Sequence, residues 1–148
     1  MTRPALLAAL FALLAAPALA DPPTVVTITG TFDDATFELQ NAITNAGLVI
    51  DSVSHTGDML ERTKTAVGAT RTIFTHADVF SFCSAKVSRE VMEADPMNVQ
   101  FCPYHIFVAE QPEAPGRILI GHQVYTGPAM DKVNALLDGI IKDALSSN

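Results

Sequence analysis

The C-terminal stretch Pro128 to Leu145, PAMDKVNALLDGIIKDAL, carries the clearest amphipathic pattern in the chain. Its apolar residues recur every three or four positions, the spacing of one face of an α-helix. They are Met130, Val133, Leu136, Leu137, Ile140, Ile141, Ala144 and Leu145. Such a broad apolar face needs a sheet to cover it. Gly139 weakens the helix by about 1 kcal/mol relative to alanine, so we expect the helix backbone to lie close against that sheet.

Five segments upstream of this helix have the composition and alternation typical of strands. Val99 to Ala109 and Arg117 to Tyr125 are separated by a short loop with two prolines and a glycine, which predicts an antiparallel hairpin. The other predicted strands are Thr24 to Thr29, Leu48 to His55 and Ala77 to Cys83. We therefore predict an α+β fold, in which the long C-terminal amphipathic helix packs across a curved, mainly antiparallel sheet of about five strands.

Shorter helices are expected between the strands. One should begin near Phe32, with Asp33 as its capping residue. Asp58 to Val67 predicts a weak amphipathic helix or a loop. Ser84 to Ala94 predicts a short helix that must end before Pro96, because the residue that precedes a proline avoids the helical conformation.

Residues 1–20 have the order of a cleavable signal peptide. Arg3 is the only charge before the apolar run Ala5 to Ala16, and Ala18-Leu19-Ala20 supplies small residues for cleavage. The run is too short to span a bilayer of about 30 Å as a stable anchor. We therefore expect an exported protein, periplasmic or secreted, with no membrane insertion after cleavage and with residues 21–148 as a single domain.

The charge balance excludes two classes of partner. Loss of Arg3 leaves eight basic and sixteen acidic residues, a formal charge of −8, and the basic residues are scattered singly. Nucleic acids and anionic membranes attract clustered positive charge. Neither is expected as a partner.

The segment Phe82 to Val108 resembles a known family, domain of unknown function 302. The resemblance rests on three motifs in fixed order: Phe82 to Lys86 (FCSAK), Met92 to Pro96 (MEADP) and Cys102 to Val108 (CPYHIFV). It extends over roughly residues 30 to 126. The resemblance implies a compact α/β sandwich with a curved sheet, and self-association, so that a homodimer is expected. It implies no reaction.

Cys83 and Cys102 are the only cysteines. An even number in an exported protein favours a disulfide. Such a bond would close a loop of about 20 residues and stabilise the fold by about 3 kcal/mol. The alternative is a redox-active pair, which a strained or exposed bond would favour.

A metal or haem site is a second alternative for the same region. Cys102 and His105 offer a thiolate and an imidazole three residues apart, and soft or borderline metals accept both ligands. Alternation along a strand would place them on opposite faces, so only an irregularity near Pro103 would bring them together.

Three residues are candidates for lining a ligand pocket: His55, His122 and Tyr104. His55 closes a predicted strand, matches a family position and precedes the turn Thr56-Gly57-Asp58. His122 shares a predicted strand face with apolar residues, so it is either a hydrogen-bonded core histidine or a polar group in an internal pocket.

The sequence lacks the common enzyme signatures, among them a Gly-rich phosphate loop, Gly-x-Ser-x-Gly, His-Glu-x-x-His and Cys-x-x-Cys. The leading hypothesis is a non-enzymatic module without a cofactor, which binds a small molecule or protein between the sheet and the C-terminal helix and carries a structural Cys83–Cys102 disulfide. The competing hypothesis is a redox protein, or one that handles a metal or haem, using these cysteines and nearby histidines.

Overall fold

The computed structural model describes residues 22–146, so the predicted signal peptide lies outside the described residues. The elements, in chain order, are β1 (Thr24–Thr29), α1 (Phe32–Asn45), β2 (Val49–His55), α2 (Thr56–Thr63), β3 (His76–Cys83), α3 (Ala85–Ala94), the 3₁₀ helix η1 (Pro96–Phe101), β4 (Tyr104–Glu110), β5 (Arg117–His122) and α4 (Asp131–Ser146). None of the helices in this part of the chain has the length and apolar content needed to cross a membrane.

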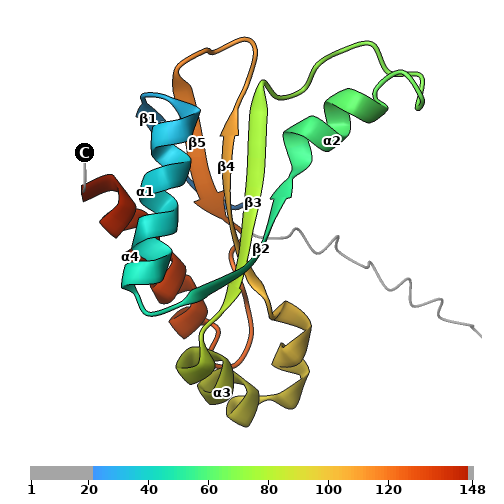
Figure 1. The fold of residues 1–148 in the computed structure, drawn as a ribbon. Helices are drawn as coiled ribbons and strands as arrows, with labels where there is room; N and C mark the ends of the chain where they lie inside the picture. Colours follow the sequence, from blue (N-terminus) through green and yellow to red (C-terminus); the bar gives the residue numbers. More distant parts are fainter. Residues whose placement is uncertain (1–21, 147–148) are drawn as a thin grey trace, which may run out of the picture.

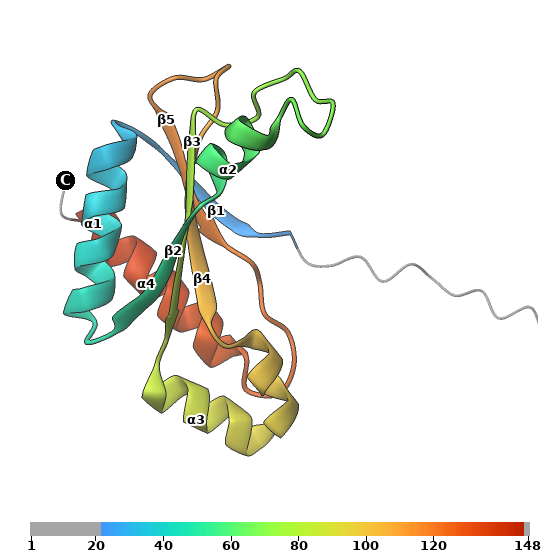
Figure 2. The ribbon, with the colours of Figure 1, turned by 45° about the vertical axis from the view of Figure 1, so that its right-hand side comes forward.

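The five strands form one antiparallel sheet in the order β1-β5-β4-β3-β2. Helices α1 and α4 lie side by side on one face of the twisted sheet (Figures 1 and 2). We call this the helix face and the opposite one the open face. Helix α2 stands near one end of the sheet on the open side, and α3 lies at the other end. The predicted α+β class, the sheet and the packing of the C-terminal helix on it are confirmed.

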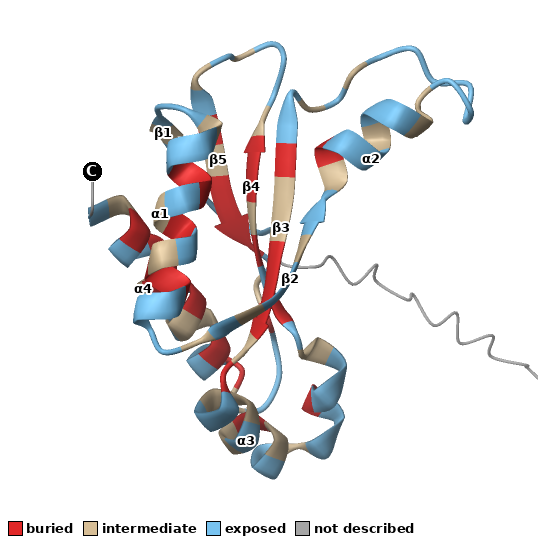
Figure 3. Ribbon diagram, viewed as in Figure 1, coloured by how far each residue is buried: buried red, intermediate tan, exposed pale blue. Residues whose placement is uncertain are grey.

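The hydrophobic core lies between the helix face and the two long helices (Figure 3). Alternation along each strand sends every second side chain into it. The strands contribute Phe80, Phe82, Tyr104, Ile106, Val108, Ile118 and Ile120, and the helices contribute Leu39, Ile43, Val133, Leu137, Ile140 and Ile141. These side chains fill the space between the sheet and α4, where the sequence had suggested a binding groove.

The start of α1 differs from the prediction in its cap. Thr31 is the N-cap residue, and its Oγ1 accepts a hydrogen bond from the backbone N–H of Asp34 at 3.1 Å. Asp33 lies in the first helical turn, where a carboxylate interacts favourably with the helix dipole. The capping residue is therefore the one that precedes Phe32, and not the one that follows it.

The predicted strand Val99 to Ala109 begins five residues too early. Pro96–Phe101 forms η1 instead, and β4 begins only at Tyr104. The carboxylate of Asp95 accepts a hydrogen bond from the N–H of Met97 at 2.9 Å, and Pro96 stands at the first helical position. Asn98 is buried and donates to the carbonyl oxygens of Val91 and Pro128. These contacts outweigh the strand propensity of the segment.

The hairpin of β4 and β5 is confirmed, although β5 ends at His122 and not at Tyr125. Tyr125 exchanges two hydrogen bonds with the side chain of Asn134 in α4, at 2.9 and 2.8 Å. Because the amide of Asn134 binds both the N–H and the C=O of Tyr125, this backbone needs no strand partner.

The backbone of α4 does not lie close against the sheet at Gly139, so that prediction is wrong. A Cβ atom built on Gly139 meets no atom within 4 Å. The close approach occurs instead at Gly121 of β5, where a Cβ would lie 2.3 Å from the carbonyl oxygen of Thr24 and 2.9 Å from Cζ of Phe107.

Candidate functional site

Cys83 and Cys102 form a disulfide, with Cα atoms 6.2 Å apart. Cys83 ends β3 and Cys102 follows η1, so the bond joins the two ends of the segment 84–101, which contains α3 and η1. The hydroxyl oxygen of Ser88 on α3 lies 3.9 Å from the sulfur of Cys102. The bond therefore holds this segment against the end of the sheet. Because both sulfurs are oxidised, neither is a thiolate.

Tyr104 is completely buried in the core. Its hydroxyl accepts a hydrogen bond from Ser88 at 3.2 Å, and its ring meets that of Tyr125 edge to face, with ring centroids 5.8 Å apart. The structure thus places Tyr104 as a core residue that joins α3 to β4.

His105 follows Tyr104 and lies on the opposite, open face of β4, where it is exposed. The side chains around it still displace some water from the imidazole, and this desolvation lowers the pKa of His105. Cys102, which was considered as its partner ligand, bonds to Cys83 instead. Within residues 22–146 no group of three or more His, Cys, Asp or Glu side chains has an arrangement that could hold a metal ion.

His122 is fully buried at the end of β5, on the helix face. Its Nδ1 lies 2.7 Å from the carbonyl oxygen of Gln123, and its Nε2 lies 3.0 Å from Oδ1 of Asp138 on α4. Both ring nitrogens thus lie within hydrogen-bond distance of an oxygen atom. The structure places His122 as a hydrogen-bonded core histidine that ties the sheet to α4.

His55 lies at the end of β2, where its Nδ1 donates to Oδ1 of Asp78 on β3 at 2.8 Å. The imidazole is exposed, whereas the carboxylate of Asp78 is mostly buried. The hydrogen bond from His55 to Asp78, the negative charge of Asp78 and that of Asp58 raise the pKa of the imidazole. His55 and His122 do not form a common site, because β3 and β4 lie between β2 and β5.

The open face carries an apolar depression of about 430 Å³ that the sequence analysis missed. Its floor is formed by neighbouring side chains of the three central strands: Ala77, Val79, Phe107, Ala109 and Leu119. Asp78 and Val108 also border the depression. Since they alternate with the floor residues, their side chains point toward the helix face. The alternation of Val79, Phe107 and Leu119 with core residues was the signal that could have revealed a second apolar face.

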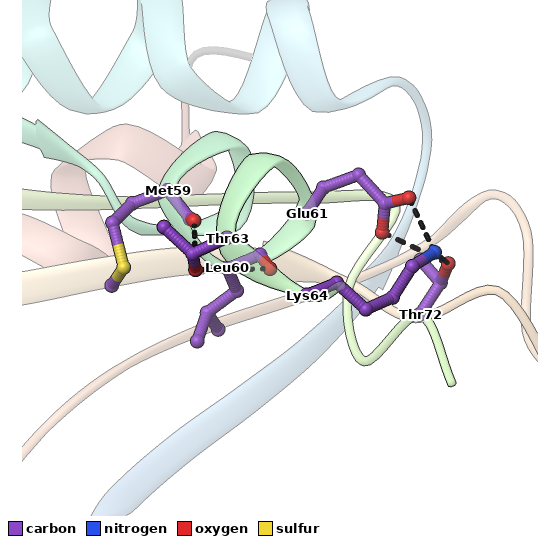
Figure 4. A network of polar contacts seen from close by, with 6 residues as sticks. All are labelled: Met59, Leu60, Glu61, Thr63, Lys64 and Thr72. Atoms are coloured by element: carbon purple, nitrogen blue, oxygen red, sulfur yellow. Dashed lines mark hydrogen bonds and ion pairs between the residues drawn. The ribbon is translucent and has the colours of Figure 1, made fainter. Parts of the chain in front are cut away.

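The loop between α2 and β3 brings Phe74 to the edge of this depression. Figure 4 shows how the loop is held against α2. Lys64 donates to the hydroxyl of Thr72 at 3.1 Å, and Thr72 donates to Glu61 at 3.0 Å. The hydrogen bonds from Lys64 and Thr72 lower the pKa of Glu61. Thr56 and Gln111 supply the polar groups at the rim.

These features define the class of protein: a small α+β domain with one helix layer, a disulfide at one end of its sheet and an apolar depression on the uncovered face. The family model for the domain of unknown function DUF302 matches residues 24–141, and the chain belongs to this family.

A solved structure supports the same fold. The chain is similar to an uncharacterised conserved DUF302 protein from Bacillus stearothermophilus, with a TM-score of 0.65 and 14% sequence identity. The similarity covers 84% of this chain and 95% of that protein. No curated protein matches the chain.

Proposed function

We propose that this protein is an exported, non-enzymatic binding module and that its binding surface is the apolar depression on the open face of the sheet. One observation carries the proposal: half-buried Val79, Phe107 and Leu119 form a continuous apolar floor on a face without a covering helix layer. A volume of about 430 Å³ lies within the range of roughly 300–1,000 Å³ that is usual for small-molecule sites.

The lining indicates an apolar, uncharged ligand. The floor offers only aliphatic and aromatic side chains, and Thr56 and Gln111 at the rim can each form neutral hydrogen bonds. Asp78 borders the depression, but its side chain points toward the helix face, where its carboxylate accepts a hydrogen bond from His55. The negative net charge of the chain also disfavours anionic ligands.

Export and the disulfide belong together in this proposal. The order of charge, apolar run and small residues in positions 1–20 is that of a signal peptide. An exported domain meets an oxidising compartment, in which the Cys83–Cys102 bond is stable. We expect the protein isolated from the periplasm or the medium to begin at Asp21, as its intact mass would show. A mass that retains residues 1–20 would contradict export by cleavage.

Binding at the depression can be tested with the neutral apolar dye Nile red. We expect the native protein to raise the fluorescence of the dye, and Leu119→Gln to weaken its binding by about tenfold through the loss of apolar contact. Val49→Gln is the matched control, because Val49 is also an exposed aliphatic strand residue but lies on β2, outside the depression. Equal binding by both variants would reject the depression as the site.

A further inference from the structure

A second hollow lies next to the apolar depression, between α2 and the loop that joins α2 to β3. It is a cavity of about 100 Å³. Its apolar walls are formed by Leu60, Val67, Ala69, Ile73 and Phe74. Among these residues, Val67 is 74% exposed and Ile73 is 44% exposed. Exposed apolar side chains that gather around a hollow are typical of a surface that a ligand covers.

The cavity and the depression meet at Phe74, which lines both. The first turn of α2 belongs to the same boundary, because Thr56 borders the depression and its neighbour Gly57 borders the cavity. Gly57 lies directly against β3: a Cβ atom there would be 2.7 Å from the backbone nitrogen of Ala77, a floor residue of the depression. The two hollows are therefore adjacent, and one ligand can contact both.

We propose that the cavity is a specificity pocket of the depression, which receives a short alkyl group of the ligand while the rest of the ligand lies on the apolar floor. This inference rests on the proposed function, because the alkyl group belongs to a ligand that is bound at the depression. A cavity of about 100 Å³ is smaller than the roughly 150 Å³ of an engineered apolar cavity that binds benzene. It therefore suits a chain of a few carbon atoms better than an additional ring.

The charged side chains that border the cavity already have partners. Lys64 forms an ion pair with Glu61, and Arg71 forms one with Glu113, in which the nitrogen and oxygen atoms are 3.5 Å apart. A charged group of a ligand would have to compete with these pairs. The cavity thus suits an uncharged alkyl group, in agreement with the uncharged ligand that the lining of the depression indicates.

Hydrogen bonds within the loop hold the walls of the cavity in place. The N–H of Ala69 donates to the carbonyl oxygen of Lys64 at 2.9 Å, and the φ of 72° at Gly68 turns the chain back toward α2. At the other end of the loop, the N–H of Thr75 donates to the carbonyl oxygen of Glu110 on β4 at 2.8 Å. Together with the network of Figure 4, these bonds form the pocket before a ligand arrives, which lowers the entropic cost of binding.

The test uses neutral, fluorescent alkoxycoumarins whose alkyl group lengthens from methyl to butyl. We expect each added methylene to tighten binding to the native protein by up to about fourfold, as full burial of a methylene would. Ala69→Phe should abolish this gain because the new ring fills the cavity, and Val67→Gln should reduce it because one wall becomes polar. Both variants should bind the methoxy compound as the native protein does.

Val49→Gln is the matched control for Val67→Gln, because the two valines are 75% and 74% exposed and Val49 borders neither hollow. It should keep the native gain for each methylene. The proposal is overturned if Ala69→Phe keeps that gain, or if the affinity of the native protein does not rise with alkyl length. Nile red separates such a failure from that of the proposed function: if the native protein binds the dye and Leu119→Gln weakens this binding, only the specificity pocket is rejected.

Discussion

The ring of Phe107 on β4 lies against the backbone of Gly121 on β5, its direct neighbour in the sheet. A Cβ atom at Gly121 would come within 2.9 Å of the ring and within 2.3 Å of the carbonyl oxygen of Thr24. The absence of a side chain at one position thus lets an aromatic ring lie across the open face. It also shapes the floor of the depression, since Phe107 lines it.

Gly121→Ala should therefore destabilise the fold. The carbonyl of Thr24 belongs to the backbone of β1 and cannot move without disturbing its pairing with β5. Overpacking of this kind costs typically about 1–3 kcal/mol, and we expect a loss of about 2–3 kcal/mol in urea unfolding. A variant as stable as the native protein would show that β1 and Phe107 shift freely.

Gly139→Ala should have the opposite effect. Gly139 lies inside α4, where an added Cβ meets nothing within 4 Å. Alanine is favoured over glycine in a helix interior by about 1 kcal/mol, so we expect the unfolding free energy to rise by up to this amount. Because the same substitution is made at Gly121 and Gly139, each variant serves as the control for the other. A loss of stability at Gly139 would indicate a contact between α4 and the sheet that the structure does not have.

Removal of the disulfide should lower stability without changing the fold. The bond joins residues 19 positions apart, and closing a loop of this length is worth about 3 kcal/mol in the chain-entropy model. We expect the double variant Cys83→Ala, Cys102→Ala to lose about this amount in urea unfolding and to keep its circular dichroism spectrum.

Thiol titration distinguishes the structural role of this disulfide from a redox role. In the native protein we expect no reactive thiol until denaturant and reductant are added together, because the bond is part of the folded structure. Ready reduction of the native protein by a mild dithiol would instead favour the redox hypothesis.

The contact between His122 and Asp138 should contribute to the attachment of α4. The imidazole is fully buried, but Asp138 is 55% exposed, so solvent weakens their interaction. We expect Asp138→Ala to lower the unfolding free energy by about 1 kcal/mol. Lys142→Ala, a change at an exposed position of the same helix, is the control and should have little effect. Equal losses in the two variants would argue against a specific role for the pair.

The pair of His55 and Asp78 predicts a pH dependence. The hydrogen bond to Asp78 raises the pKa of His55 in the folded protein, so the pair favours the folded state fully at pH values below the unfolded pKa of about 6.5. This contribution is lost as the pH rises through the folded-state pKa. NMR titration of the imidazole should show a midpoint above the ordinary value, and Asp78→Asn should lower it. A native midpoint at or below about 6.5 would contradict the hydrogen bond.

The sequence alone predicted most of the helices and strands, because hydrophobic periodicity and the positions of glycine and proline are local features of the chain. The apolar spacing of residues 128–145 predicted α4, and the prolines and glycine between residues 109 and 117 predicted the hairpin. The errors arose where a contact with a distant residue, or a helix cap that was not recognised, determined the secondary structure. Asn134 removed Tyr125 from the end of β5, and the cap at Asp95 made a 3₁₀ helix from the start of a predicted strand.

The candidate site depended more strongly on tertiary structure. Two cysteines could be counted in the sequence, but only the positions of β3 and β4 brought them within bonding distance. His55 and His122 looked alike as strand histidines, yet one is exposed beside Asp78 and the other is buried against α4. Alternation showed that each strand has two faces. Which face the helices cover, and hence which apolar side chains stay open to solvent, depends on contacts between residues distant along the chain, and those form only when the whole sheet is assembled.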